Sequence, residues 1–210
     1  MELKDRIKKK ADEMFRKYGI RSVTMDEIAR QLGVSKKTIY QSYSDKDELV
    51  DAVITDMISV NQECCIQERG EALNAVHEVF LAVEMVQEMF ASLNPSILYD
   101  LERGHPKTFQ KFHQHRHKFL YQIIKDNIER GKKEKLYRSD ILTDVAVKVR
   151  LETMMLPFNQ EVFPKSKYNI ASLVMQLAEY FLYGIATSKG AELVLQYQKE
   201  QSKKSRKNAR

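Results

Sequence analysis

Residues 19–49 read GIRSVTMDEIARQLGVSKKTIYQSYSDKDEL, and the order of these residues predicts the local structure of the N-terminal part. Thr24 stands three residues before Glu27, which is the spacing of a capping box at the start of a helix. Gly33 is placed to end that helix, because glycine accepts the positive φ of a helix C-terminus. Ser35 is then placed to cap a second short helix over about 36–42. The pattern predicts a helix, a sharp turn and a second helix.

Helical periodicity extends on both sides of this unit. An amphipathic helix is expected over 3–18, where apolar residues recur at spacings of three and four. Downstream, the same periodicity predicts helices over about 72–93, 106–130, 141–156 and 169–188. The chain has only seven glycines and four prolines, and it shows little period-two alternation. We therefore predict an all-α protein.

The second helix of the motif is expected to keep one side free. Ile39 is its buried residue, whereas Lys36, Lys37 and Thr38 lie at its N-terminal end. A major groove admits one α-helix, and the N-terminal residues of a recognition helix reach the base edges. Lysine donates to guanine acceptors, threonine contacts the thymine methyl group, and glutamine reads adenine, which adds Gln41. We predict sequence-specific binding to double-stranded DNA.

Four further side chains are placed to meet the DNA backbone. Tyr40, Tyr43 and Lys46 accompany the reading residues, and Thr24 opens the first helix of the motif. Phosphate contacts fix the register of a protein on DNA and carry no sequence information directly. Thr24 is also a helix cap, and a tyrosine at position 43 is often half core, so a purely structural role stays open for these two residues.

The motif resembles the DNA-binding segment of the TetR family of repressors. The residues that agree with the family's pattern in order and spacing are Thr24, Ile28, Ala29, Gly33, Val34, Ser35, Thr38, Ile39, Tyr40, Tyr43, Lys46 and Leu49. One position departs from it, because many members carry His or Tyr where Ser42 stands. Two shorter segments, 131–140 and 181–190, resemble the approach to the penultimate helix and the end of the last helix in this family.

The resemblance implies an N-terminal three-helix DNA-binding domain followed by a larger helical domain. We expect the helix-turn-helix domain over 1–48, with its motif at about 24–43. A ligand-binding and dimerisation domain is expected over 49–188, and a basic, mobile tail over 189–210. The implied function is a transcriptional regulator. Specifically, we expect a repressor homodimer that a small apolar or amphipathic ligand releases from the palindromic half-sites of its operator.

Two sets of residues follow from this implied architecture. Methionine and aromatic side chains are expected to line the ligand pocket, and they are Met85, Met89, Phe90, Phe112, Phe119, Met154 and Phe158. Apolar residues on the last two main helices are expected to form the dimer interface, and they are Val145, Val149, Val174, Leu177 and Phe181. An ordinary intramolecular core is the alternative interpretation of both sets, because such residues at helical spacing are usually core.

The charge distribution agrees with contact to a polyanion at defined places. The net charge is +6; residues 1–50 carry 12 basic against 9 acidic residues, and residues 199–210 carry six against one. A solvated, frayed end is the alternative interpretation of the basic tail. No signal peptide and no apolar run of about 18 residues is present, so we expect a cytoplasmic protein without membrane contact.

Metal and cofactor chemistry is not expected. Cys64 and Cys65 are adjacent, a spacing that favours neither a disulfide nor a zinc site. His113 and His117 stand four residues apart beside His105 and His115, yet basic residues flank them and no acid stands at a matching spacing.

Two other classes of function are alternatives to a ligand-responsive regulator. An architectural or scaffold protein would use the same N-terminal motif to organise DNA without a small-molecule switch. An enzyme is the weakest alternative, because the sequence holds no nucleophile elbow, zinc-protease motif or glycine-rich phosphate loop. An enclosed cavity would favour the ligand-responsive regulator, and a solid core would favour the architectural protein.

Overall fold

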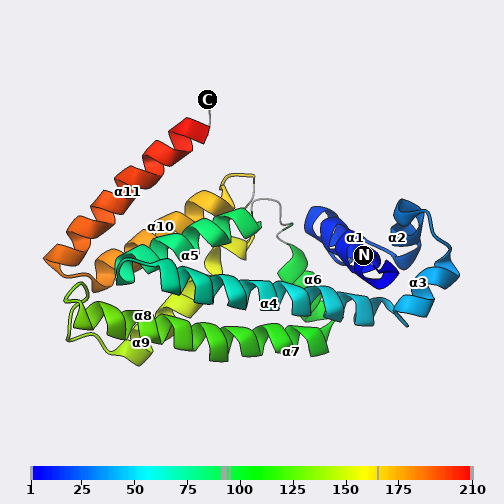
Figure 1. The fold of residues 1–210 in the computed structure, drawn as a ribbon, viewed down its shortest axis with the longest axis horizontal. Helices are drawn as coiled ribbons and strands as arrows, with labels where there is room; N and C mark the ends of the chain where they lie inside the picture. Colours follow the sequence, from blue (N-terminus) through cyan, green and yellow to red (C-terminus); the bar gives the residue numbers. More distant parts are fainter. Residues whose placement is uncertain (1, 91–93, 95, 165, 209–210) are drawn as a thin grey trace. The chain divides into compact units, whose positions relative to one another are not determined.

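The computed structural model describes residues 2–90, 94, 96–164 and 166–208, with the backbone alone for residues 90 and 204–208. Within these ranges the chain is helical and contains no strand. Its α-helices are α1 (Leu3–Tyr18), α2 (Met25–Leu32), α3 (Lys36–Ser42), α4 (Lys46–Glu71), α5 (Ala75–Phe90), α6 (Ser96–Gly104), α7 (Pro106–Gln114), α8 (Tyr121–Lys133), α9 (Thr143–Thr153), α10 (Ile170–Ile185) and α11 (Ser188–Asn208) (Figure 1). None of these described helices is long and apolar enough to cross a membrane.

The all-α prediction is confirmed, and the first three helices have the predicted bounds. The later helices are shorter than predicted. The expected helix over 106–130 is divided by η1 (His115–Leu120), a π-helical segment between α7 and α8. A further short segment, η2 (Leu156–Phe158), is a 3-10 helix that follows α9.

The chain divides into two compact units. One unit comprises residues 1–63 and 92–116, and the other comprises 64–91 and 117–210. The predicted boundary after residue 48 therefore differs from the structure. Helix α4 continues without interruption from Lys46 to Glu71, so the N-terminal unit takes the first part of this helix together with α6 and α7.

The core of the N-terminal unit is built from the apolar faces of its first helices. Helix α1 buries Ile7, Ala11 and Phe15, α2 buries Ile28, and α3 buries Ile39. Each of these side chains comes from the face that the apolar periodicity predicts. Because α3 contributes one buried residue, the remainder of this seven-residue helix is available to solvent.

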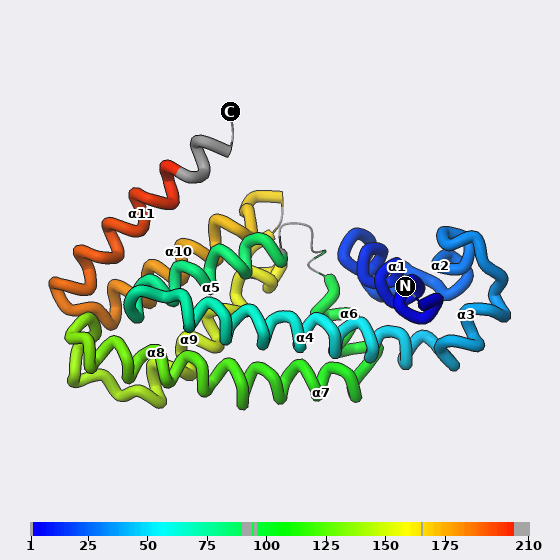
Figure 2. Tube along the Cα trace, in the orientation of Figure 1, coloured from blue at the N-terminus to red at the C-terminus, as the bar shows by residue number. Residues whose placement is uncertain are grey.

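The second unit has a larger core. Helices α5 and α10 run side by side in it, and α8 packs against α9 (Figure 2). The residues of its main buried cluster are Ala75, Val76, Phe80, Ile128, Leu136, Tyr137, Ala146, Val147, Leu151, Leu182, Ile185, Val194 and Tyr197. This cluster joins these four helices and α11, which fixes their packing within the unit.

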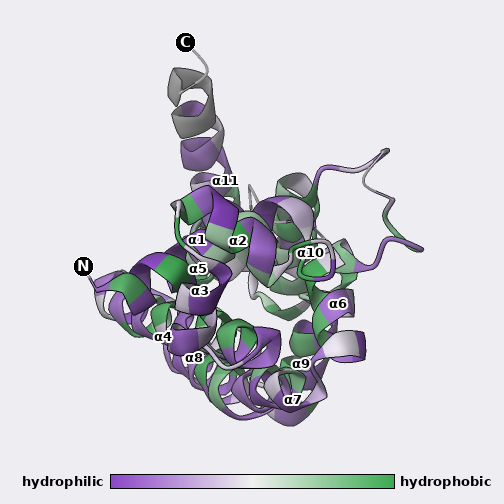
Figure 3. Ribbon diagram, turned by 90° about the vertical axis from the view of Figure 1, so that its right-hand side faces the viewer, coloured by the Kyte–Doolittle hydropathy of each residue, from purple (hydrophilic) through white to green (hydrophobic). Residues whose placement is uncertain are grey.

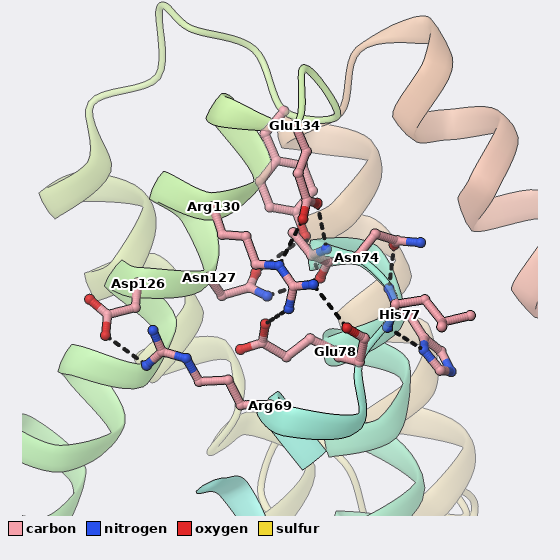
Figure 4. A network of polar contacts seen from close by, with 12 residues as sticks. Arg69, Asn74, His77, Glu78, Asp126, Asn127, Arg130 and Glu134 are labelled. Atoms are coloured by element: carbon pink, nitrogen blue, oxygen red, sulfur yellow. Dashed lines mark hydrogen bonds and ion pairs between the residues drawn. The ribbon is translucent and has the colours of Figure 1, made fainter. Parts of the chain in front are cut away.

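A polar network ties the start of α5 to the end of α8 (Figure 4). The Arg130 guanidinium donates to Glu134 at 2.7 Å, to Glu78 at 3.1 Å and to the Ala72 carbonyl at 2.9 Å. Asn127 donates to the Ala75 carbonyl at 2.9 Å. These charged hydrogen bonds pair the half-buried arginine with the buried Glu78, and pairing of this kind lowers the cost of burying a charge.

The C-terminal segment differs from the expected mobile tail. Residues 188–208 form α11, in which Val194 is fully buried and Tyr197 is 7% exposed. The Tyr197 ring stacks on His77 with centroids 4.9 Å apart, and its hydroxyl accepts a hydrogen bond from Asn74. The first part of this segment therefore packs against the other helices of the second unit, where its apolar side chains are buried.

Candidate nucleic-acid interface

Two helix caps position the candidate recognition helix. The Thr24 hydroxyl accepts from the Glu27 N–H, and the Glu27 carboxylate accepts from the Thr24 N–H at 2.8 Å, which confirms the predicted capping box. Gly33 adopts the left-handed conformation with φ 67° and ends α2. The Ser35 hydroxyl then accepts from the Thr38 N–H at 3.1 Å and opens α3. Local hydrogen bonding thus sets the turn between the two helices.

Replacement of Thr24 by alanine tests this local account. The variant loses the acceptor of the capping box, so we expect the free energy of unfolding to fall by about 1 kcal/mol, whereas Thr24→Ser retains most of it. Thermal or urea unfolding measures the change. Ser22→Ala is the matched control, because Ser22 is an exposed hydroxyl with no hydrogen-bond partner among the described residues. An equal effect of Thr24→Ala and Ser22→Ala would contradict the assignment.

The exposed side of α3 carries the predicted base-reading residues. Lys36, Lys37 and Gln41 are exposed and Thr38 is half-buried, while Ile39 is fully buried on the opposite side. The ribbon in Figure 3 accordingly shows α3 as mostly hydrophilic. A single helical surface therefore presents several hydrogen-bonding groups to solvent, which is the arrangement that a recognition helix needs.

The two lysines of this surface differ in their partners. Lys36 forms an ion pair with Asp26 of α2 at 2.9 Å, and this hydrogen-bonded carboxylate raises the pKa of Lys36. The Lys36 ammonium also lies 5.8 Å from the centre of the Tyr40 ring, which is 41% exposed. Lys37 makes no hydrogen bond or ion pair with any described residue. Lys37 is therefore the freer cation of this surface.

Thr38 keeps its predicted apolar contact available. Its hydroxyl lies 2.7 Å from the Ser35 hydroxyl, so its polar end is already engaged within the protein. The methyl group of the same side chain is therefore the part of Thr38 for which the predicted contact with a thymine methyl group stays a prediction.

Tyr43 does not lie on the exposed surface, so its predicted phosphate contact is not supported. Its side chain is 2% exposed, and its hydroxyl donates to the Lys4 carbonyl of α1 at 3.4 Å. Burial raises the pKa of this hydroxyl. The residue closes the core under α3, which is the structural alternative that the sequence left open.

Lys46 is engaged inside the N-terminal unit. Its ammonium donates to the Ile20 carbonyl at 2.6 Å, and burial lowers its pKa. This contact joins the start of α4 to the loop after α1. A role in binding phosphate therefore rests on the donors that this carbonyl leaves free, because an ammonium has three.

The residues predicted to line a ligand pocket are similar in how far their side chains are buried. The six whose side chains are described are all half-buried, and they are Met85, Met89, Phe112, Phe119, Met154 and Phe158. The side chain of Phe90 lies outside the described part. Phe112 belongs to the N-terminal unit, whereas the other five belong to the second unit. Half-buried apolar side chains are suited to lining a binding surface, because part of their apolar surface is not buried in the core.

The residues predicted for the dimer interface separate into two groups. Val145 and Val149 on α9 are 53% and 51% exposed. Leu177 and Phe181 on α10 are half-buried. Val174, in contrast, is buried against Val83 and Ala178 within the second unit. Val174 therefore lies in the core of this unit, where α5 packs against it, and this favours the intramolecular alternative for Val174.

Two histidines of the predicted cluster, His105 and His115, contact neighbouring side chains. His115 is buried; its Nε2 lies 3.0 Å from Asn61 Oδ1, and its Nδ1 lies 3.3 Å from Gln62 Nε2. Desolvation lowers the pKa of His115. His105 Nδ1 lies 2.7 Å from the Asp47 carboxylate. These contacts explain both histidines as structural groups of the N-terminal unit.

The N-terminal part of the chain is similar to a family of known regulators. Residues 7–53 match the family described as bacterial regulatory proteins, tetR family. The chain is also 33% identical over 88 residues to the uncharacterized HTH-type transcriptional regulator YvaF of Bacillus subtilis (strain 168). That alignment spans 40% of this chain and 45% of YvaF, so the chain spans about half the length of the curated relative that it matches.

The fold is similar to that of solved regulators over most of the chain. A transcriptional regulator from Saccharomonospora viridis in complex with choline has a TM-score of 0.74 at 17% identity, covering 88% of this chain and 97% of that one. The fatty acid degradation regulator FadR from Bacillus halodurans has a TM-score of 0.69 at 17% identity, with the same two coverages. At these identities the likeness establishes the fold alone.

Proposed function

We propose, on the premise that this chain is a TetR-family transcriptional regulator, that it binds a palindromic operator as a homodimer through the exposed side of α3. The observation that carries the proposal is the composition of this helix. Lys36, Lys37, Thr38 and Gln41 are accessible while Ile39 anchors the opposite side in the core. The sequence spacing of these residues within the family's motif supports the same role.

The side chains divide into two roles in this proposal. Lys37, Thr38 and Gln41 read base edges, because they are free to meet hydrogen-bonding groups or methyl groups in a major groove. Lys36 and Tyr40 contact phosphate or base edges. For this contact Lys36 leaves its solvent-exposed ion pair with Asp26 and binds DNA instead. An exposed ion pair of this kind contributes little, so the exchange costs little.

Helices α9 and α10 supply the proposed dimer interface. Leu142, Val145 and Val149 recur at spacings of three and four, and all three are more than half exposed. Tyr180 on α10 is 64% exposed, and Leu177 on the same helix is half-buried. Phe181 instead contacts Arg150 of the same chain. Two such helices from each subunit form a four-helix interface across a two-fold axis, which positions two recognition helices for two half-sites.

A small ligand acts as the proposed switch. The half-buried methionine and aromatic side chains of the second unit support an apolar or amphipathic ligand, and the S. viridis neighbour was solved with choline. A coupling free energy of about 1–3 kcal/mol between the ligand and the operator changes operator affinity about 5- to 150-fold. In this proposal the protein represses transcription while it is bound to the operator, and binding of the ligand releases the protein from the DNA.

Selection of binding sites from random double-stranded DNA tests the proposal. We expect an inverted repeat whose half-site centres lie about 10–10.5 base pairs apart or a multiple of that spacing, because two-fold protein symmetry imposes it. Enrichment of unrelated sequences with no repeat would overturn the operator-binding proposal and favour the architectural alternative. The selected site is then the probe for the experiments described below.

A further inference from the structure

Arg150 is a buried cation without an anionic partner. It lies on α9 among the buried residues Ala146, Val147 and Leu151, and it is 8% exposed. No described residue offers its guanidinium a carboxylate or a hydrogen-bond acceptor, although every Asp and Glu of the chain is described. The Phe181 ring of α10 is a close neighbour, with its centroid 5.4 Å from the guanidinium carbon. The buried Tyr137 hydroxyl also interacts electrostatically with Arg150, but it is not an anion at neutral pH.

The buried carboxylate of Glu78 in this unit has an ion-pair partner. Glu78, which is 6% exposed, pairs with Arg130, and Arg130 also pairs with Glu134. Arg150 lacks such compensation, and burial lowers its pKa to about 10, so the side chain still carries its charge at neutral pH. A desolvated, unpaired charge destabilises a folded protein. Its presence in a buried environment therefore calls for an anion that the described residues do not supply.

The position of Arg150 on α9 argues against the dimer interface as the source of that anion. Val145 and Val149 mark the exposed face, and Arg150 lies about 100° around the helix from Val149. Met154 follows Arg150 by four residues and therefore lies on nearly the same side. Arg150 thus shares its side of the helix with a half-buried residue of the predicted pocket and turns away from the exposed valines.

We propose that Arg150 binds the anionic head group of an amphipathic ligand, whose apolar tail packs against Met154, Phe158 and Phe181. The inference rests on the proposed ligand-responsive function and names the chemical class of the ligand. A planar guanidinium matches a carboxylate or a phosphate with two parallel hydrogen bonds. Phe181 already holds this guanidinium against its ring, which orders the side chain before the ligand arrives.

Binding of four twelve-carbon probes to the purified full chain tests this assignment in the absence of DNA. The probes are dodecanoate, dodecyl phosphate, dodecanol and dodecyltrimethylammonium, each below its micelle-forming concentration and titrated by calorimetry. We expect dodecanoate or dodecyl phosphate to bind and to raise Tm, and the two anions distinguish a carboxylate from a phosphate ligand. Dodecanol and dodecyltrimethylammonium are expected to bind at least about tenfold more weakly, because they lack the charged hydrogen bonds.

Variants of α9 assign the effect to Arg150. Arg150→Met is expected to weaken binding of the anionic probe at least about tenfold, and Arg150→Lys to weaken it less, because lysine keeps the charge and loses the fork. Lys148→Gln, which removes an exposed charge from the same helix, should bind like wild type. Without ligand, Arg150→Met should have a Tm at or above that of wild type, because it removes an unpaired buried charge.

Several results would overturn the assignment. These are equal binding of charged and neutral probes, binding of none of the four, and undiminished binding by Arg150→Met. Conversion of Arg150→Met to a monomer would also overturn it, since the missing anion would then come from a second copy of the chain. Operator selection is independent of these titrations, so a protein that selects an operator but binds no anionic probe loses this inference and keeps its DNA-binding function.

Discussion

Replacement of Lys37 by alanine is expected to weaken binding to the selected operator about 5- to 150-fold, the equivalent of about 1–3 kcal/mol for a lost base contact. Lys37 is exposed at the N-terminal end of α3 and makes no ion pair with a described residue, so its ammonium is free for a guanine. Fluorescence anisotropy with labelled operator measures the change. Sequence preference should relax at one position of each half-site.

A charge-matched variant separates base reading from general electrostatic attraction. Lys125→Ala removes one exposed lysine from α8, and it should leave the preference among operator variants unchanged. Lys36→Ala is expected to relax the sequence preference less than Lys37→Ala, because phosphate is one of the proposed contacts of Lys36 and carries no sequence information. Unchanged affinity and unchanged preference in Lys37→Ala would remove Lys37 from the base-reading set.

Replacement of Gly131 by alanine is expected to destabilise the second unit by about 3 kcal/mol through overpacking. A β-carbon at this position would overlap three carbons of the Tyr137 ring. The ring has no room to move, because it is 1% exposed and its hydroxyl lies 3.0 Å from the Ala75 carbonyl and 3.2 Å from Asn127 Oδ1. Urea unfolding followed by circular dichroism measures the loss.

Gly70→Ala provides the control for this prediction. Gly70 also lies in a helix, and a β-carbon there meets nothing within 4 Å. We expect this variant to be neutral or more stable by up to about 1 kcal/mol, because alanine loses less backbone entropy than glycine. If Gly131→Ala were as stable as Gly70→Ala, the close approach of Tyr137 to α8 would be wrong.

The N-terminal helices were predictable to the residue because short-range interactions determine them. Thr24 and Glu27 cap α2, Gly33 ends it, and Ser35 caps α3, all through contacts within a few residues. Capping hydrogen bonds of this kind leave a signature in the order of the residues. The exposed side of α3 follows directly, since Ile39 occupies the buried side of a helix of two turns.

Long-range contacts explain what sequence patterns missed. Tyr43 is buried because α1 offers its hydroxyl a backbone carbonyl, and Lys46 turns inward to the Ile20 carbonyl. Tyr197 docks α11 on α5 through His77, although a basic segment is usually solvated. Arg150 was missed for a different reason. The sequence signal was a single arginine in an apolar helix face. Only the folded unit shows that no described carboxylate pairs with this arginine.

Methylation protection by dimethyl sulfate shows whether the exposed side of α3 enters the major groove. This reagent modifies guanine N7 in the major groove and adenine N3 in the minor groove. We expect the bound protein to protect a guanine N7 in each half-site of the selected operator, and Lys37→Ala to lose this protection. Protection of adenine N3 with guanine N7 left reactive would contradict it.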